Sequence, residues 1–496
     1  MEQFQSVVKA LQEGQSPESS DVVKVYQHSL EKQDNVSLIM VKAAQTKYLI
    51  AVGDGPLFDA LNGEVVQGGK VCPLTHENSQ VLNQFFDYTK PQAFGTDIAT
   101  MGLGDRLGLA SPGHIETVRD RKVKPILAQQ SIRELTLLNR TMTDILDAAT
   151  FAVFQEGYKD GYGADADHIK LEEDIKYALD LGFSFITLDC SEQIRNGIEE
   201  MSVAEVSKEF ASLPAERKDY YSTHYVNKSF DADGLNITFD EASLHKNVLV
   251  YGEAIDFMEH VYNAYISKAE KAIDFEISID ETETVTAPEA HFFVAEELRR
   301  RGVTVQSLAP RFCGEFQKGI DYIGDITQFE KELQEHAEIA KYFGYKLSIH
   351  SGSDKFSVFP IIGKYTEGLL HIKTAGTNWL EAVRVIAQVN PDLYRRMHVY
   401  AEEHFEETLK YYHVTPDLDS VAPLNETKDE ELPSYMDHDA SRQLFHVTYG
   451  ILLTAQDEAG NDLFNTEFFT TLINHEDAYR ESLVKHIGRH VDLLGL

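Results

Sequence analysis

The feature of this sequence that most restricts its fold is an alternation of short strand-like runs with helical runs, which begins near residue 90. The eight strand-like runs are AFGTDIATMGLG, PILAQQ, GYGADAD, FSFITLDCS, DFEISID, TVQSLAP, KLSIHSG and LLHIKTAG. Strands that alternate with helices in this way form parallel βα units. Eight such units in series predict a (β/α)8 TIM-type barrel. An open doubly wound sheet is the alternative, because a sequence does not show whether a sheet closes.

Three segments lie outside this repeat. Residues 1–90 predict an N-terminal α/β extension in which VSLIMVKA and KYLIAVGDG are paired strands. Residues from about 191 to 270 predict an insertion, rich in charge and helix formers, between two strands of the repeat. Residues 391–496 predict a mainly helical C-terminal region, so the catalytic barrel would span residues 91–390.

Four predicted strands carry polar residues at alternate positions, although strands covered on both faces normally read as continuous hydrophobic runs. In DFEISID, the residues Glu276, Ser278 and Asp280 share one face. The same pattern holds for Thr187 and Asp189, for Ser348 and His350, and for His371 and Lys373. One such strand could lie at a sheet edge, but a sheet has only two edges. We therefore expect a shared polar pocket at the carboxyl ends of the strands, where barrel enzymes have their active sites.

The run GADADHIK, residues 163–170, has two interpretations. DADH could be a solvated turn that caps the helical run LEEDIKYALDLG, or it could belong to an active site. The polar faces of the other strands favour the active site. The predicted pocket then contains Asp165, Asp167, His168, Lys170, Asp189, Glu276, Arg311, Gln317, His350, His371 and Lys373. Mixed histidine and oxygen ligands suit a divalent cation such as Mn, Ni, Co or Zn, but the sequence does not identify which.

Two other motifs carry less information. GLGDRLG, residues 102–108, lacks the third glycine of a dinucleotide-binding loop, because Leu107 stands in its place. We expect this loop to present Arg106 to an anionic ligand, with Ser111 as the N-cap of the next helix. DHD, residues 437–439, together with His446 favours a helix-capping turn over a metal cluster.

The formal net charge of −36 argues against a nucleic-acid partner, because phosphate binding requires a basic surface. An anionic substrate would need a local group of Lys or Arg. The three cysteines have no metal-like spacing, the N-terminus lacks the pattern of a signal peptide, and no apolar run is long enough to span a membrane. The sequence thus predicts a cytoplasmic protein with no membrane partner. It leaves the oligomeric state open, with a homo-oligomer as one option.

Several stretches together resemble the tagaturonate epimerase family of bacteria. They are GLGDRLGLASPGH, GADADHIK, FITLDCS, SLAPRFCGEFQKGIDYIGD, IHSGSDKF and HIKTAGTNWLEA, and the resemblance extends from about residue 90 to the end. It implies a metal-dependent enzyme of hexuronate catabolism that interconverts D-tagaturonate and D-fructuronate by inverting C4 of the ketose. It also implies tagatose and fructose as secondary substrates.

The resemblance implies roles for individual residues. Asp167 would be the proton acceptor and Glu276 the proton donor, while His168, His350 and Gln317 would bind the metal. Glu315 is the alternative to Gln317, because a carboxylate is the stronger ligand. The cations available to bind the substrate carboxylate are Arg106, Lys170, Arg311, Lys355 and Lys373.

Two questions of function stay open in the sequence. Another metal-dependent sugar isomerase or an aldolase on a similar barrel would need the same kinds of residue, and a non-catalytic sugar-acid binding protein is a third option. For the epimerase, the inverted carbon is β to the ketone, so simple enolisation does not acidify its C–H bond. We therefore expect a retro-aldol route, with direct deprotonation of that carbon as the alternative.

Overall fold

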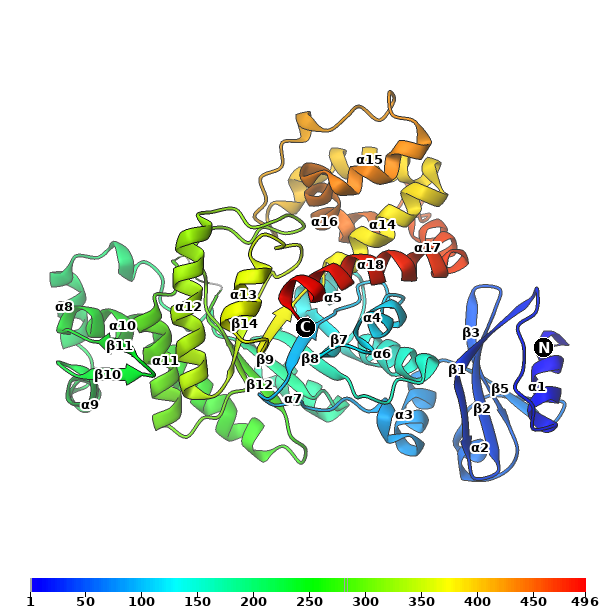
Figure 1. Ribbon diagram of the computed structural model, residues 1–496, viewed down its shortest axis with the longest axis horizontal. Helices are drawn as coiled ribbons and strands as arrows, with labels where there is room; N and C mark the ends of the chain where they lie inside the picture. Colours follow the sequence, from blue (N-terminus) through cyan, green and yellow to red (C-terminus); the bar gives the residue numbers. More distant parts are fainter. Residues whose placement is uncertain (1, 281, 283) are drawn as a thin grey trace.

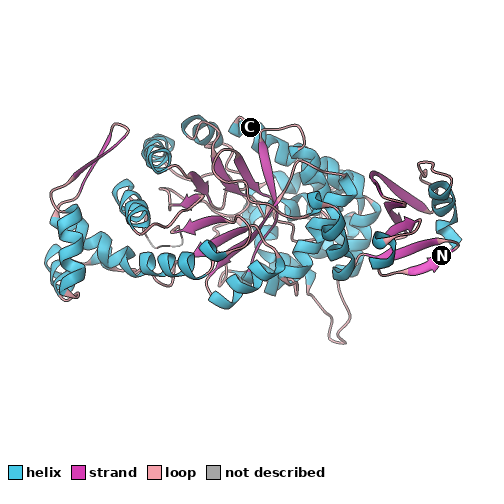
Figure 2. Cartoon of the chain, turned by 90° about the horizontal axis from the view of Figure 1, so that it is seen from below, coloured by secondary structure: helices cyan, strands magenta, loops and turns pink. Residues whose placement is uncertain are grey.

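The computed structural model describes residues 2–280, 282 and 284–496, and its centre is a closed barrel of eight parallel strands (Figures 1 and 2). In chain order the strands are β6 (Ala99–Gly102), β7 (Val123–Ser131), β8 (Gly163–Ile169), β9 (Phe185–Asp189), β12 (Asp274–Ser278), β13 (Ser307–Ala309), β14 (Lys346–Ile349) and β15 (Leu370–Lys373). The last strand pairs with the first, with His371 opposite Thr100. Each of the eight strand-like runs supplies one strand. The barrel prediction is confirmed, and closure excludes the open sheet.

Helices follow the strands around the outside of the barrel. They are α4 (Ser111–Val118), α5 (Ile132–Leu137), α6 (Met142–Glu156), α7 (Glu172–Leu181), α10 (Glu241–Ala264), α11 (Pro288–Arg300), α12 (Ile326–Phe343), α13 (Phe359–Tyr365) and α14 (Thr377–Val389). The chain after β7 forms two helices, α5 and α6. The division falls at Asn139, whose φ of 52° is left-handed, and Thr141 then caps α6 in a capping box with Asp144.

The N-terminal segment contains a five-stranded antiparallel sheet in the order β1-β2-β3-β5-β4. Its strands are β1 (Val23–Gln33), β2 (Val36–Ala43), β3 (Thr46–Val52), β4 (Glu64–Val66) and β5 (Gly69–Pro73), and its helices are α1 (Gln5–Gln12), α2 (Pro56–Ala60) and α3 (His76–Phe85). One face packs on α1 through residues such as Val8 and Ile39. The other face packs on α3 and α6 through Met40, Leu49 and Phe154, which attaches the sheet to the barrel.

The segment between β9 and β12 extends from the barrel at the end opposite the N-terminal sheet (Figures 1 and 2). It contains α8 (Val203–Ala211), α9 (Ala215–Tyr225), the hairpin β10 (Ser229–Ala232) and β11 (Leu235–Thr238), and then α10. After α14 the chain forms α15 (Pro391–Glu403), α16 (Asp439–Leu453), α17 (Asn465–Asn474) and α18 (Glu476–Leu494). Among the described residues, no helix is long and apolar enough to cross a membrane.

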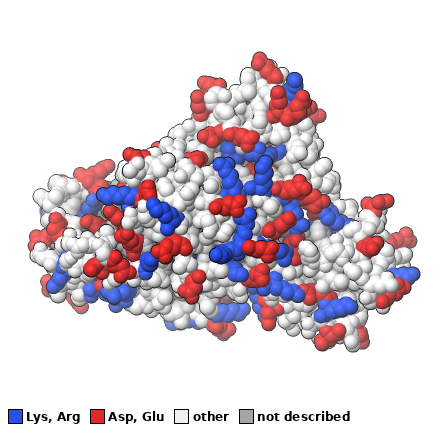
Figure 3. Space-filling view, in the orientation of Figure 1, with Lys and Arg blue, Asp and Glu red and all other residues white. Residues whose placement is uncertain are grey.

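The charge of the protein is unevenly distributed. On the face shown in Figure 3, basic side chains gather in a central band and acidic side chains surround it. Local groups of Lys and Arg therefore exist despite the net charge of −36.

The DADH run lies within β8 rather than in a turn. Asp165 and Asp167 are buried, and the helix that follows has Leu171 at its N-cap without a side-chain hydrogen bond. The interpretation of DADH as a helix cap is therefore wrong. The predicted cap at Ser111 is wrong as well, because α4 begins at Ser111. Ahead of this helix, the Asp105 carboxylate accepts hydrogen bonds from the backbone amides of Leu107, Gly108 and Ala110.

Candidate active site

A cavity of about 480 Å³ lies at the carboxyl ends of the barrel strands, a volume typical of small-molecule sites. The polar residues that line it include Arg106, Gln129, Glu134, Asp167, His168, Lys170, Asp189, Asp280, Lys318, His350, Lys373 and His446. Most follow or end a barrel strand, whereas His446 comes from α16. The cavity thus lies where the polar faces of the strands predict a pocket.

Lys373 at the end of β15 is the centre of a buried polar cluster. Its Nζ donates to Asp167 Oδ1 at 2.5 Å and to Thr187 Oγ1 at 2.6 Å. The same atom lies 3.0 Å from both Asp165 Oδ2 and Glu276 Oε1. One ammonium therefore holds three carboxyl groups from β8 and β12 inside the barrel.

The three carboxyl groups of the cluster differ in pKa. Burial raises the pKa of Asp165 to about 7, although Lys373 opposes the rise. Burial also acts on Asp167, but His168 and Lys373 outweigh it and hold the pKa of that carboxyl well below its usual value. Burial acts on Glu276 in the same way, but Lys373 and His350 outweigh it and hold the pKa of that carboxyl well below its usual value. Asp167 and Glu276 are therefore ionised near neutral pH, and a proton in this cluster resides mainly at Asp165.

Three side chains could hold a divalent cation. Ligand atoms of His168, Asp280 and His350 all lie within 4.8 Å of one another. His350 Nδ1 is buried and lies 3.1 Å from Asp280 Oδ1; against the effect of burial, Asp280 and Glu276 raise the pKa of His350 to about 10. A divalent cation could replace the proton between these two atoms, and a donor set of two imidazoles and one carboxylate fits Mn, Co, Ni or Zn.

Each of these histidines is held by a buried carboxylate through its other ring nitrogen. His168 Nδ1 lies 2.7 Å from Asp167 Oδ1, and His350 Nε2 lies 2.7 Å from Glu276 Oε1. Such a carboxylate partner fixes the orientation of a metal-binding imidazole and increases its basicity. Asp167, the predicted base, and Glu276, the predicted acid, therefore also orient the two histidines.

Asp167 and Glu276 differ in their access to the cavity. Asp167 lines it, and its Oδ2 accepts a hydrogen bond from Gln129 at 2.6 Å. Glu276 is fully buried and is not among the described lining residues. Glu276 instead contacts two residues that line the cavity, through a hydrogen bond to His350 and an ion pair with Lys373.

Three predicted substrate-binding cations line the cavity: Arg106, Lys170 and Lys373. Arg106 is buried, donates from Nε to Glu134 Oε1 at 2.9 Å and stacks on Tyr449. Lys170 Nζ donates to Ser191 Oγ at 3.0 Å and lies 3.5 Å from Asp189 Oδ2.

Lys355, Arg311 and Gln317 are not among the described residues that line the cavity. Lys355 Nζ donates to the backbone carbonyls of Gln317, Ile320 and Ser353, which gives it a structural position.

The Gln317 side chain is hydrogen-bonded to the C-terminal region. Its Oε1 accepts a hydrogen bond from the Gln443 side chain at 2.7 Å and one from the Thr415 backbone amide at 3.1 Å. Glu315 contacts Gln317 and His413. Glu315 is not in the group formed by His168, Asp280 and His350, and Gln317 stays a prediction as a ligand.

The structure also adds residues to the predicted site. Asp280 was predicted to share the polar face of its strand with Glu276, but not to bind a metal. Lys318 and His446 line the cavity, and one ring nitrogen of His446 is buried without a hydrogen bond. His446 packs closely against Gly376, where a β-carbon would collide with its ring. No periodicity in the sequence connects α16 to the loop after β15.

The fold and the cavity together define a (β/α)8-barrel enzyme whose acidic, basic and imidazole groups meet at the carboxyl ends of the strands. Comparisons with known proteins narrow this class. Residues 26–494 match the tagaturonate epimerase family. The chain is 44% identical over 478 residues to the tagaturonate/fructuronate epimerase of Thermotoga maritima, covering 95% of this chain and 97% of that one.

Solved structures agree with this assignment. The glycerol-complexed crystal structure of fructuronate-tagaturonate epimerase UxaE from Cohnella laeviribosi has a TM-score of 0.96 and 56% identity, over 100% of both chains. The native crystal structure of the same protein has a TM-score of 0.95 and 55% identity over the same coverage. The chain belongs to the tagaturonate epimerase family and is therefore an epimerase, an enzyme of the isomerase class. The resemblance seen in the sequence is confirmed.

Proposed function

We propose that this protein is a divalent-metal-dependent epimerase that interconverts D-tagaturonate and D-fructuronate, the substrates named for its relatives. The observation that carries the metal dependence is the arrangement of His168 and His350. A buried carboxylate holds each ring at one nitrogen, and ligand atoms of both rings lie within 4.8 Å of an Asp280 oxygen.

His168, His350 and Asp280 would hold the cation. When bound there, it would supply Lewis acidity that polarises the ketone and stabilises the negative charge that develops during reaction. Gln317 stays a prediction as a ligand, because its amide would first have to leave Gln443 and Thr415.

Asp167 is the proposed proton acceptor. It lines the cavity, and His168 and Lys373 keep it ionised against the effect of burial, which a base requires before it accepts a proton. In the retro-aldol route Asp167 takes the proton of the C4 hydroxyl while the C3–C4 bond opens. The new aldehyde turns its other face, the bond closes, and the proton returns to the oxygen.

Glu276 is the proposed proton donor; because its carboxylate is ionised near neutral pH, the proton that it would deliver is one that it shares with the Lys373 ammonium. The Lys373 ammonium touches Glu276 and Asp167 at once and lines the cavity, so it connects the buried carboxyl to the reacting oxygen. Asp165, whose pKa of about 7 lies near neutrality, would keep a proton available to the same ammonium.

The substrate carboxylate would be attracted by the cations that line the cavity, Arg106, Lys170 and Lys318. A charge-assisted hydrogen bond contributes about 1.5–3 kcal/mol, so the neutral ketohexoses tagatose and fructose would be slower, secondary substrates. The three cysteines are free and buried, which supports the proposal that the enzyme acts in the cytoplasm.

A metal add-back assay tests this function. The protein is stripped with EDTA, its metal content is measured by mass spectrometry, and fructuronate formation from tagaturonate is followed after addition of Mn²⁺, Co²⁺, Ni²⁺ or Zn²⁺. We expect activity to be lost on stripping and restored by at least one of these ions. Full turnover by protein without bound metal would contradict the metal dependence while leaving the epimerase activity intact.

A further inference from the structure

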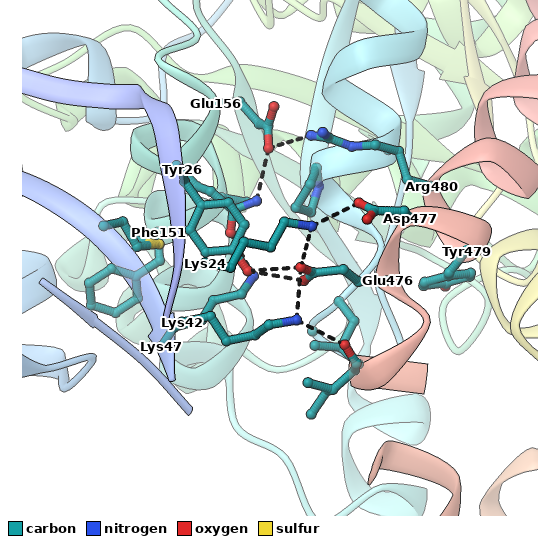
Figure 4. A pocket seen from close by; sticks show the side chains of 18 of the residues that line it. Lys24, Tyr26, Lys42, Lys47, Phe151, Glu156, Glu476, Asp477, Tyr479 and Arg480 are labelled. Carbon is teal, nitrogen blue, oxygen red and sulfur yellow. Dashed lines mark hydrogen bonds and ion pairs between the residues drawn. The ribbon is translucent and has the colours of Figure 1, made fainter. Parts of the chain in front are cut away.

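A second cavity of about 420 Å³ lies between the N-terminal sheet, α4, α6 and the start of α18 (Figure 4). Among the described residues, it shares no lining residue with the catalytic cavity. Its volume falls within the range of small-molecule sites.

Three lysines from neighbouring strands line one wall of this cavity. Lys24 of β1 is the direct cross-strand partner of Lys42 of β2, and Lys42 is the direct partner of Lys47 of β3. Cross-strand partners point to the same face, and like charges placed directly opposite each other destabilise a sheet. A row of three lysines therefore requires anions beside it, even though the whole chain is strongly acidic.

The protein supplies anions for only part of this row. Glu476 lies 2.7 Å from Lys24 Nζ and 2.8 Å from Lys42 Nζ, and Asp477 accepts a hydrogen bond from Lys24 (Figure 4). Lys47 Nζ donates to the neutral amide oxygen of Gln155 at 2.6 Å. Within the described part of the chain, no carboxylate forms an ion pair with Lys47. Burial lowers the pKa of Lys47 to about 8 against the effect of Glu476, as expected for an ammonium whose counter-charge is incomplete.

The remaining walls define the kind of ligand. Arg480 adds a fourth cation, which is paired with Glu156. Phe151, Leu472 and Leu483 add apolar surface beside the charged groups. We propose that this second cavity binds a small organic anion, a carboxylate or a phosphate monoester, with Lys47 as the residue that anchors its charge. The apolar walls would cover the uncharged part of the ligand.

Calorimetric titration of the full chain tests the proposal, with inorganic phosphate and malonate as probes and with ionic strength held constant by chloride. Lys47→Met removes the charge, and Lys47→Gln is a second neutral variant in case the first folds poorly. The matched control is Lys341→Met, because Lys341 of α12 forms an exposed ion pair with Glu367 and is not among the described residues that line this cavity.

We expect saturable binding of at least one probe, weakened about tenfold or more by either Lys47 variant, as for the loss of one charge-assisted hydrogen bond. Lys341→Met should leave the affinity unchanged within about twofold. Binding of phosphate alone would identify a phosphate ester as the ligand class, and binding of malonate a carboxylate. If neither probe binds, or if the Lys47 variants bind as the parent protein does, the lysine row serves only to attach the sheet to α18 and the proposal is wrong.

Discussion

Replacing Lys373 by Met should strongly destabilise the protein and abolish its activity. The substitution keeps most of the side-chain volume but removes the ammonium that lies 2.5 Å from Asp167 and 3.0 Å from both Asp165 and Glu276. Asp167 and Glu276 are ionised, and at about 3 Å and an effective dielectric constant of about 20 each of these two pairs has a Coulomb energy of roughly 5 kcal/mol. The desolvation of the buried ammonium offsets part of this sum. We therefore expect the free energy of unfolding to fall by about 3–5 kcal/mol, the range for breaking a buried ion pair.

The assay is urea unfolding of the variant and the parent protein, with turnover measured on the folded variant. Lys341→Met is the control, since that lysine and its partner Glu367 are both about two-thirds exposed, and we expect a loss of no more than about 1 kcal/mol. A double variant adds Glu276→Gln to Lys373→Met. Because Glu276 is ionised and fully buried, this change removes a charge that has lost its ammonium partner, and it should recover more than about 1 kcal/mol of the lost stability. A loss below about 1 kcal/mol for Lys373→Met, or strictly additive effects in the double variant, would refute the central role of this ammonium.

Three further predictions concern the metal, the mechanism and pH. We expect less bound metal and slower turnover in each of the variants His168→Ala, His350→Ala and Asp280→Asn. Gln317→Ala should keep its metal. If Asp280→Asn keeps its full metal content and Gln317→Ala loses metal, Gln317 is the third ligand. In deuterated water the retro-aldol route leaves hydrogen on the inverted carbon, and NMR detection of stoichiometric deuterium there would establish direct deprotonation instead. Burial lowers the pKa of Lys355 from 10.5 to about 7, so the unfolded chain binds more protons between these values and the free energy of unfolding should rise with pH across that window. Urea unfolding at pH 7 to 10 should therefore show the parent protein gaining stability relative to Lys355→Met, and a constant difference would contradict this.

The sequence predicts those parts of the site that follow strand periodicity. Glu276, His350, Lys373 and Asp167 alternate with apolar residues, and the pleat of a strand directs alternate side chains to one face. Because parallel strands in a closed barrel direct that face to the interior, these residues meet around Lys373. The barrel itself is predictable for the same reason, since strand and helix periods alternate along the chain.

The sequence does not predict side chains carried by loops and distant helices. Lys355, close behind a strand end, turns to three backbone carbonyls, because no period fixes the direction of a loop side chain. Gln317 is held by Thr415 and Gln443, which lie about a hundred residues further along the chain. His446 enters the cavity only because α16 folds back over the barrel. These contacts depend on tertiary packing, which leaves no local pattern in the sequence.

The central claim is that the barrel cavity interconverts tagaturonate and fructuronate. The most direct test is proton NMR of the metal-loaded protein incubated separately with each sugar acid until the spectra stop changing. We predict that both reactions reach the same mixture of the two sugar acids, with no other product. An unchanged spectrum from either starting sugar, or the appearance of three-carbon fragments as from an aldolase, would contradict the claim.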